Sequence, residues 1–259
     1  MLTQHAHTSD CWWNREQARW ICDQVPLVQP DPERSSASLP DPPLVDVRDM
    51  IVVHTAMLRE FRLAPAAVHR VEPGASRRAA VVDRHLGFLC DLLHHHHEGE
   101  DSLLWPPLRE RMPAAAITQL DAAESQHVDI DAALHRVADA RTLWRGDPSE
   151  SNRTCLVTDL EHLHTILKAH LELEERTLLP LAATLLTEAE WLAVGDAAAE
   201  ALPKTTLVLA FGMFSYEGDP VVLKAMLASA PALPRVLIPR IAPHVYARRA
   251  HRIHGTSRP

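Results

Sequence analysis

The feature that most constrains the fold is a helical spacing of apolar residues that recurs in four long segments. In the first segment, at about 44–63, Val47, Ile51 and Leu58 are separated by three or four residues, or multiples of that spacing, and so share one helix face. The other three segments run from after Gly74 to about 104, then at about 114–144 and about 150–179. We expect the first helix to end before Pro65 and the fourth to end at Pro180. Four helices of this length joined by short links pack most simply as an antiparallel up-and-down bundle. We therefore predict an all-α fold.

The composition agrees with this fold class and excludes several classes of function. Of the 259 residues, only 5% are aromatic and 8 are glycine, which argues against a β-sandwich or barrel. The glycine positions leave no Gly-x-Gly-x-x-Gly, P-loop or Gly-x-Ser-x-Gly motif, so the common nucleotide-binding and serine-hydrolase loops are absent. A formal net charge of −8 disfavours general nucleic-acid binding. No apolar run approaches the roughly 20 residues of a membrane helix. We expect no nucleic-acid partner and no membrane partner.

The two ends of the chain differ from the central segment. Residues 1–43 are rich in proline and serine, which predicts an irregular tail, although Trp12, Trp13 and Trp20 could form a short amphipathic turn. We expect the bundle to occupy 44–186 and a helical extension to occupy 187–259. Within the extension, weaker helical patterns lie near 188–201, 204–216 and 219–229. Beyond these, Pro231, Pro234, Pro239 and Pro243 predict a tail broken into short pieces.

The charges of the last forty residues are one-sided. No acidic residue follows Asp219, while basic residues accumulate at Lys224, Arg235, Arg240, Arg248, Arg249, Arg252 and Arg258. A solvated helix surface is the ordinary interpretation of such a run, and an anionic partner is the alternative.

The cysteines indicate the compartment. Cys11, Cys22, Cys90 and Cys155 are widely spaced and form no Cys-x-x-Cys pair, so they do not suggest a disulfide framework. The charged residues near the N-terminus leave no apolar stretch typical of a signal peptide. We expect a cytoplasmic protein in which Cys90 and Cys155 are buried packing residues.

A repeat of histidine and glutamate carries the chemical signal in this chain, which has 17 histidines. The motif His96-x-x-x-Glu100 is followed by an acidic residue, by leucine four residues after the glutamate and by proline six residues after it. The motif His170-x-x-x-Glu174 has the same followers, 74 residues later. A spacing of four places histidine and glutamate one turn apart on one helix face.

A second match lies upstream, because His54 and His127 are 73 residues apart. A lone histidine, or a single His-x-x-x-Glu pair, is more often a packing residue than a ligand. Four inward histidines and two inward glutamates in an apolar bundle would lose their hydration unless they bound metal. Carboxylates and imidazoles on facing helices suit a dinuclear iron or manganese site. The remaining alternative is a histidine-rich packing motif that holds no metal or only adventitious zinc.

The order His54, His96-x-x-x-Glu100, His127, His170-x-x-x-Glu174 resembles the hemerythrin-like (HHE cation-binding) family over about 44–185. The basic C-terminal part is more loosely similar to the tail of bacterial members. The resemblance implies a non-haem di-iron centre in a four-helix bundle, with Glu100 and Glu174 as bridges and the four histidines as terminal ligands. It also implies that the centre binds or reduces a small oxidant such as O2, hydrogen peroxide or nitric oxide. A sensor that responds to oxygen or iron without turnover is the alternative.

Two positions leave the ligand set open. Oxygen-carrying members have a further histidine one turn along the third ligand helix, where this chain has Asp131. This change leaves an open coordination position or adds a third carboxylate, either of which favours reactivity over reversible carriage. Alternatively, Asp131 accepts an imidazole N–H. The run of four histidines also allows His97 with Asp101 as a rival to His96 with Glu100.

Several other residues are expected outside the centre. His85 lies about three helical turns before His96, which favours a core or access-channel position over a ligand. His162 and His164 lie on other faces of their helix and are expected at the surface. Tyr216 and Tyr246 lie outside the bundle segment, which would leave no tyrosine inside it for radical chemistry.

Overall fold

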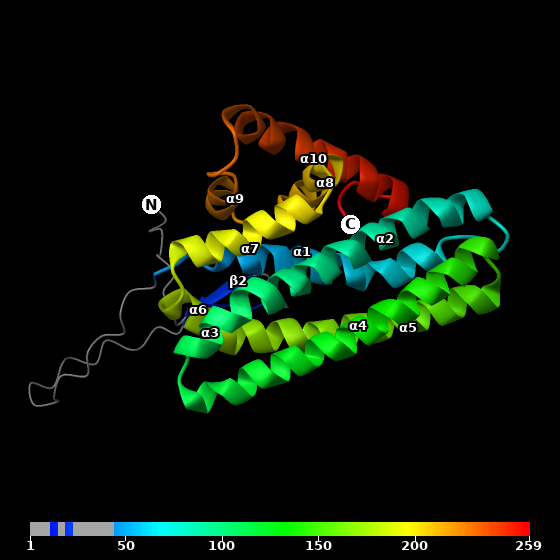
Figure 1. The fold of residues 1–259 in the computed structure, drawn as a ribbon. Helices are drawn as coiled ribbons and strands as arrows, with labels where there is room; N and C mark the ends of the chain where they lie inside the picture. The colour runs from blue at the N-terminus through cyan, green and yellow to red at the C-terminus, as the bar shows by residue number, and fades with distance from the viewer. Residues whose placement is uncertain (1–10, 15–18, 23–43) are drawn as a thin grey trace, which may run out of the picture.

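The computed structural model describes residues 11–14, 19–22 and 44–259 (Figure 1). Its described strands are β1 (Cys11–Asn14) and β2 (Arg19–Cys22), which pair antiparallel with Cys11 opposite Cys22. The prediction of an irregular tail is therefore wrong at these two strands, and the rest of 1–43 lies outside the described residues. Tryptophan and isoleucine favour paired strands. At these residues the local preference for strands outweighs the proline-rich composition from which an irregular tail was predicted.

The long helices of the bundle segment form a closed ring of neighbours. They are α1 (Arg48–His69), α2 (Ser76–Gly99), α4 (Ile117–Gly146) and α5 (Glu150–Leu173). Contacts join α1 to α2, α2 to α4, α4 to α5 and α5 to α1. All four run lengthwise, and the α1–α2 and α4–α5 turns lie at the same end (Figure 1). The predicted all-helical class is confirmed for the described residues, apart from the hairpin.

Both halves of the repeat contain a π-helical turn that begins at the glutamate. After α2 come η1 (Glu100–Leu104) and α3 (Trp105–Arg111), and after α5 come η3 (Glu174–Leu178) and α6 (Leu179–Leu185). Pro106 and Pro180 lie in the first turn of the helix that follows, where a missing N–H is tolerated. The fourth helical segment was expected to stop at Pro180. That expectation is wrong, because the π turn lets the helical path continue through the proline.

Prolines elsewhere also fail to stop helices. The first helix was predicted to end before Pro65, but α1 continues to His69 because Ala64, Ala67 and Val68 are buried in the core on either side of the proline. By contrast, α3 ends before Pro113, because Met112 and Pro113 are extended, and a short 3-10 turn, η2 (Ala114–Ala116), then leads into α4.

The C-terminal extension is one folded layer on the bundle. Its helices α7 (Glu188–Ala201), α8 (Lys204–Phe214) and α9 (Pro220–Met226) confirm the helical patterns seen in the sequence. The last segment was expected to be broken, but it is a continuous helix, α10 (Ala232–His254). Pro239 and Pro243 are exposed and one turn apart, whereas Ala242, Tyr246 and Ala250 are buried and anchor the helix. Its basic residues are exposed except Arg249, which is half-buried.

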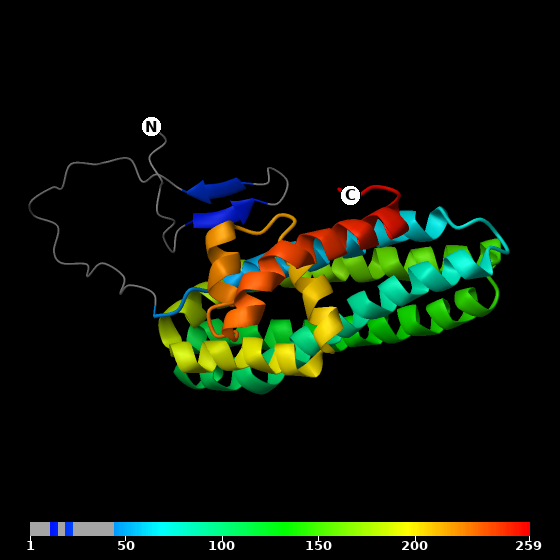
Figure 2. The same cartoon turned by 90° about the horizontal axis from the view of Figure 1, so that it is seen from above.

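All four helices of the extension contact the bundle, and α8 and α9 both pack on α1. α7 packs on α2 and η1, while α10 packs on α8, α1 and α2 and runs lengthwise over the bundle (Figure 2). Gly212 permits the close crossing of α8 and α10, since a Cβ atom there would lie 2.2 Å from the carbonyl oxygen of Ala242. In the described residues, no helix combines the length and apolar character needed to span a membrane.

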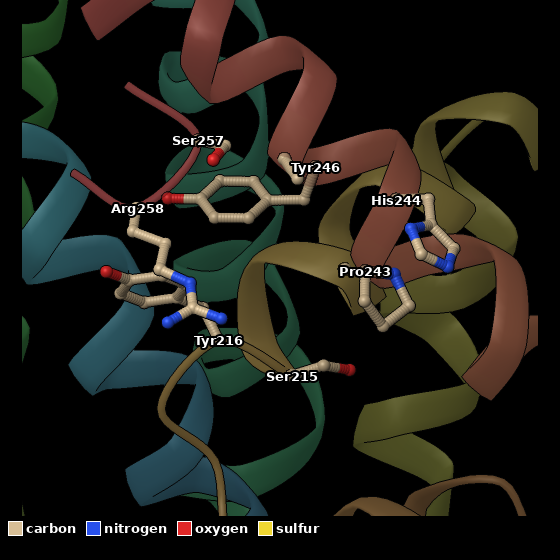
Figure 3. A pocket seen from close by; sticks show the side chains of 9 residues that line it. Ser215, Tyr216, Pro243, His244, Tyr246, Ser257 and Arg258 are labelled. Atoms are coloured by element: carbon tan, nitrogen blue, oxygen red, sulfur yellow. The ribbon is translucent and has the colours of Figure 1, made fainter.

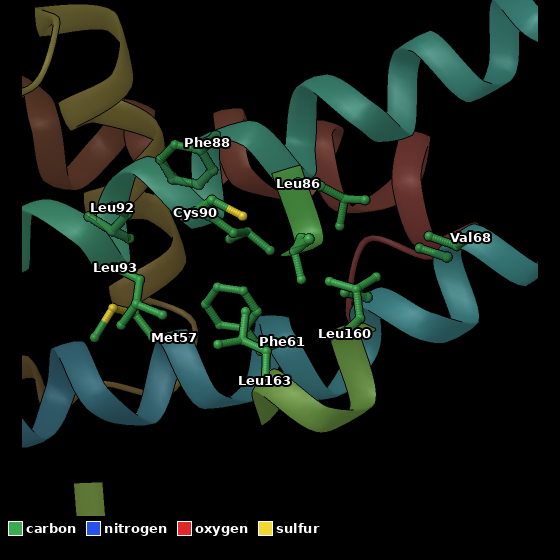
Figure 4. Packing of buried hydrophobic residues seen from close by; sticks show 14 of the residues in the cluster. Met57, Phe61, Val68, Leu86, Phe88, Cys90, Leu92, Leu93, Leu160 and Leu163 are labelled. Atoms are coloured by element: carbon green, nitrogen blue, oxygen red, sulfur yellow. The ribbon is translucent and has the colours of Figure 1, made fainter. Parts of the chain in front are cut away.

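Two apolar core clusters flank a polar layer in the bundle. The long core cluster includes Met57, Phe61, Leu93 and Leu163 (Figure 4), and the short core cluster includes Met50, Leu104, Leu120 and Leu178. On α1, His54 lies between Met50 and Met57, so it falls between the two clusters. The histidines and glutamates of α2, α4 and α5 occupy the same level of their helices. The fold therefore places polar groups where water is excluded.

Candidate metal centre

The structure brings together all six residues predicted as ligands. They are His54 on α1, His96 on α2, Glu100 at the start of η1, His127 on α4, His170 on α5 and Glu174 at the start of η3. None is more than 8% exposed. Their side-chain donor atoms form two adjacent groups that could each hold a metal ion.

The first group centres on the imidazoles of His54 and His96, whose Nε2 atoms are 3.1 Å apart. Oε1 of Glu100 lies 3.4 Å from Nε2 of His96. Oε2 of Glu174 lies 3.6 Å from Nε2 of His54. The group therefore combines two imidazole nitrogens with one oxygen from each glutamate.

The second group centres on His127 and His170, whose Nε2 atoms are also 3.1 Å apart. Oε2 of Glu100 lies 3.6 Å from Nε2 of His127. Oε1 of Glu174 lies 3.2 Å from Nε2 of His170. Each carboxylate thus directs one oxygen to each imidazole pair, which is the arrangement that a bridging ligand requires.

Polar side chains hold the outer nitrogens of three of these imidazoles. Nδ1 of His127 lies 2.8 Å from Oδ1 of Asp101, and Nδ1 of His54 lies 3.1 Å from Oε1 of Glu175. These acceptors are the acidic residues that follow Glu100 and Glu174 in the repeat, and each serves a histidine of the other half. An acceptor at Nδ1 leaves the Nε2 lone pair free to face the centre.

The third acceptor is Gln126, whose Oε1 lies 3.1 Å from Nδ1 of His170. The sequence offered a signal for the acidic pair, because an acid follows the glutamate in both repeats. It offered none for Gln126, which has no counterpart in the other half.

A seventh residue, His97, also faces the centre. It is 2% exposed, and neither ring nitrogen has a hydrogen-bond partner among the described residues. Its ring stacks on that of His127, with centroids 4.1 Å apart, and its donor atom groups with those of Glu100, His127 and His170. The sequence spacing offered His96 and His97 as alternative ligands, whereas in the structure both side chains point toward the centre. Asp101, the proposed partner in the rival register, binds His127 instead.

Asp131 does not belong to the centre. Its side chain is 50% exposed, and its Oδ1 atom lies 3.7 Å from Nδ1 of the surface residue His94. Neither a third carboxylate nor an acceptor for a centre imidazole is therefore found at this position. One helical turn from His127, the side chain of Asp131 lies at the edge of α4 next to the exposed His94 of α2.

Burial dominates the electrostatics of the centre. In residues 11–14, 19–22 and 44–259, no group forms a hydrogen bond with any of the four carboxylate oxygens of Glu100 and Glu174. Burial, reinforced by the neighbouring Glu174, raises the pKa of Glu100 well above its usual range. Burial also raises the pKa of Glu174, but the imidazoles of His170 and His54 outweigh this effect and lower it to about 2.

The electrostatics of His96, His97 and His127 favour the neutral form of the imidazole that binds metal. Burial lowers the pKa of His96 and His97 well below its usual value. Burial, followed by the neighbouring His170, lowers the pKa of His127. The buried carboxylate oxygens of Glu100 and Glu174, with imidazole nitrogens around them, fit a pair of cations because the ions would satisfy these buried donor atoms.

The residues expected outside the centre are found outside it, but Tyr246 contacts the bundle and Cys155 is not buried. His85 is buried in the core as predicted, and His162 is exposed. Tyr246 lies on α10, outside the bundle, yet its hydroxyl donates a 2.5 Å hydrogen bond to Oε1 of Glu60 on α1. Cys155 is exposed, so its predicted burial is wrong: it lies beside the inward stripe of α5 and not on it.

Cys90 is buried as predicted, and burial raises the pKa of its thiol to about 11. A cavity of about 470 Å³ lies apart from the centre, between α8, α10 and the C-terminal segment. Tyr216, Tyr246 and Arg258 are among its lining residues (Figure 3).

A comparison with protein families agrees with the geometry. The family model described as the hemerythrin HHE cation binding domain matches residues 45–182, which is more than half of the chain. Comparisons with curated proteins and with solved structures found no match. The matched segment includes every residue of the two donor groups. The chain belongs to the hemerythrin HHE cation-binding domain family.

Proposed function

We propose that residues 44–186 act as an antiparallel up-and-down four-helix bundle that holds two iron ions, with manganese as the alternative metal. The proposed ligands are His54, His96, Glu100, His127, His170 and Glu174. The observation that carries the proposal is the placement of the two glutamates. Each directs one oxygen to each imidazole pair, while none of these oxygens has a hydrogen-bond partner.

We assign His97 to the same centre as a further imidazole donor of the second group. It is buried, neutral and unpartnered beside His127. The second group would then offer three imidazoles and the first group two. The ion of the first group therefore has more room for a small external ligand. This asymmetry supplies an open position without Asp131.

The function that follows is binding or reduction of a small oxidant such as O2, hydrogen peroxide or nitric oxide. Two iron ions would supply the electrons for such chemistry. The protein residues hold the carboxylates between the imidazole pairs, keep His96 and His97 neutral through burial and, through the two apolar core clusters, exclude bulk water. Free Cys90 and Cys155 are compatible with the cytoplasmic location that we propose.

A sensor is the second candidate, and one contact favours it. Helix α7 of the extension packs on η1, the π turn that begins at Glu100. A Cβ atom at Gly99 would meet Val194 of α7 at 3.7 Å, so the two segments are in van der Waals contact range. A change in the position of Glu100 would therefore shift the helix α7 that packs on it. Catalytic consumption of peroxide or nitric oxide by the iron-loaded protein supports the enzyme, whereas a stoichiometric change of conformation without turnover supports the sensor.

Metal content of variants tests the ligand assignment. We expect His170→Ala and Glu174→Ala to lose about half or more of the bound iron, because each removes a donor and leaves its partners uncompensated. His162→Ala is the matched control, since this histidine is exposed on the same helix. Elemental analysis gives the iron per chain. Full iron in either centre variant would contradict the assignment.

A further inference from the structure

A second buried cluster of metal-ligating side chains lies where the C-terminal helix meets the bundle. It consists of Glu60 on α1, His85 on α2 and His254, the last residue of α10. Their exposed fractions are 0%, 2% and 6%, and their donor atoms all lie within 4.8 Å of one another. None of the three is a proposed ligand of the centre in the bundle.

Both imidazoles direct Nε2 to one carboxylate oxygen. Oε2 of Glu60 lies 3.1 Å from Nε2 of His85 and 3.5 Å from Nε2 of His254. The two rings meet edge to face, with centroids 5.7 Å apart. Donors at about 2.0–2.1 Å from a tetrahedral zinc ion are roughly 3.3–3.5 Å from one another. The spacing around Glu60 is therefore close to that of a zinc site.

His254 is buried with unsatisfied ring nitrogens. Within the part of the chain that the structure describes, neither of its ring nitrogens has a hydrogen-bond partner. A buried polar group left without a partner costs free energy that a simple packing residue would avoid. A cation between Nε2 of His254, Nε2 of His85 and Oε2 of Glu60 would satisfy three inward atoms at once.

The other oxygen of Glu60 is fixed by polar neighbours. Oε1 accepts a 2.5 Å hydrogen bond from the hydroxyl of Tyr246 and bonds of 3.2 and 3.3 Å from the guanidinium of Arg59. The charge of Arg59 is shared with Glu217, whose Oε2 lies 2.8 Å from Nη1. Hydrogen bonds to one oxygen of a carboxylate commonly orient the other toward a metal. Oε2 of Glu60 is thus directed at the two imidazoles.

We propose that Glu60, His85 and His254 bind one divalent transition-metal ion of the zinc class, separate from the centre in the bundle. Two imidazoles and one carboxylate are a set of three protein ligands that zinc accepts, with a fourth position left for water. Because the ligands come from α1, α2 and α10, the ion fastens the C-terminal helix to the bundle. The site gives the extension a metal-dependent attachment that does not rest on the chemistry of the oxidant centre.

Zinc content of the full chain tests the site by difference. Wild type and His254→Ala are dialysed against excess Zn²⁺, and bound zinc per chain is measured by elemental analysis. We expect His254→Ala to bind about one zinc fewer than wild type. His251→Ala is the control, because this histidine is exposed on the same helix, and it should bind as much as wild type. The difference between variants does not depend on how much metal the bundle centre holds.

Equal zinc in wild type and His254→Ala, or the same loss in His251→Ala, would overturn the proposal. A second variant, Glu60→Gln, guards against a failure of His254→Ala to fold, since it keeps the size of the side chain and removes the anionic donor. Zinc should also slow hydrogen exchange in Ala232–His254 of wild type and leave the exchange of both variants unchanged. Equal protection in wild type and variants would contradict the attachment.

Discussion

At the scale of the residue, the imidazoles of the centre depend on the acceptors behind them. We expect Asp101→Ala and Glu175→Ala each to weaken metal binding by about 10–100-fold, because they release the Nδ1 atoms of His127 and His54. Competition with a chelator measures this affinity. Glu98→Ala is the matched control, since that carboxylate is 59% exposed and pairs with a surface histidine. Unchanged affinity in both centre variants would refute the role of the acceptors.

His97 provides a second prediction at this scale. His97→Ala should lower the metal content of one of the two positions, because it removes a buried donor beside His127 and His170. The neighbouring His95 is only partly buried and pairs with Glu98, so His95→Ala should keep the metal content of wild type. Elemental analysis of the two variants distinguishes them. If His97→Ala retains all its metal, His97 is a packing residue.

The sequence predicted the six ligand candidates because two weak patterns each occur twice in the same order. The single histidine recurs after 73 residues, and the His-x-x-x-Glu pair recurs after 74. It could not decide between His96 and His97, because a run of four histidines covers the whole circumference of a helix and both can face inward. Gln126 could not be found at all, since it reaches His170 from a different helix. The two roles predicted for the Asp131 carboxylate, a third carboxylate ligand or an acceptor for an imidazole N–H, are wrong because spacing alone does not show which helix face is exposed.

At the scale of the element, the crossing of α8 and α10 depends on the absence of a side chain at Gly212. Gly212→Ala should lower the free energy of unfolding by about 2 kcal/mol or more, since its Cβ atom would meet the backbone of Ala242. Gly195→Ala is the control, because a Cβ atom there meets nothing within 4 Å and alanine favours the helix. Chemical denaturation measures both. Equal stability of the two variants would contradict the close crossing.

The contact between α1 and α7 predicts a dependence on pH. The indole N–H of Trp191 on α7 lies 3.2 Å from Asp49 on α1, and burial raises the pKa of this carboxyl to about 6. The raised pKa means that the contribution of Asp49 to the free energy of unfolding is greatest below about pH 4 and declines as pH rises through 6. Asp49→Asn lacks this decline. We expect it to equal wild type near pH 4 and to exceed its free energy of unfolding by roughly 2 kcal/mol above pH 7.

Asp46→Asn serves as the control for that measurement. The guanidinium of Arg48 lowers the pKa of Asp46 through a side-chain hydrogen bond, so its contribution to stability is lost only as pH falls below its usual pKa. The difference between Asp46→Asn and wild type should therefore be constant from about pH 5 to 8. A constant difference for Asp49→Asn as well would show that the carboxylate of Asp49 is not buried as described.

Proline explains most of the errors at the scale of the element. Pro65, Pro180 and Pro239 were each expected to end or interrupt a helix, and each lies within a helical path. The buried residues on both sides of Pro65 supply packing energy that local preference does not include. At Pro180 the preceding π turn accommodates the missing N–H. Neither cause is visible in the proline position itself.

At the scale of the whole molecule, the all-helical class followed from four apolar stripes, but the arrangement of the extension did not. Its internal packing uses Gly212, and its attachment to the bundle uses the hydrogen-bonded set of Arg59, Glu60 and Tyr246. These residues lie far apart in the sequence and have no periodic spacing. The spacing of apolar residues predicts helices because it repeats along the chain. Single contacts between distant elements leave no repeated spacing, so they are found only in the structure.

The most direct test of the central claim is the metal content of the whole protein, expressed with iron and without an affinity tag. Elemental analysis should find about two irons per chain, as expected for a dinuclear carboxylate centre. These irons should remain in His254→Ala and be reduced in Glu174→Ala. A chain without iron, or one whose only metal is zinc that His254→Ala removes, would contradict the di-iron centre and leave the histidine–glutamate repeat as a packing motif.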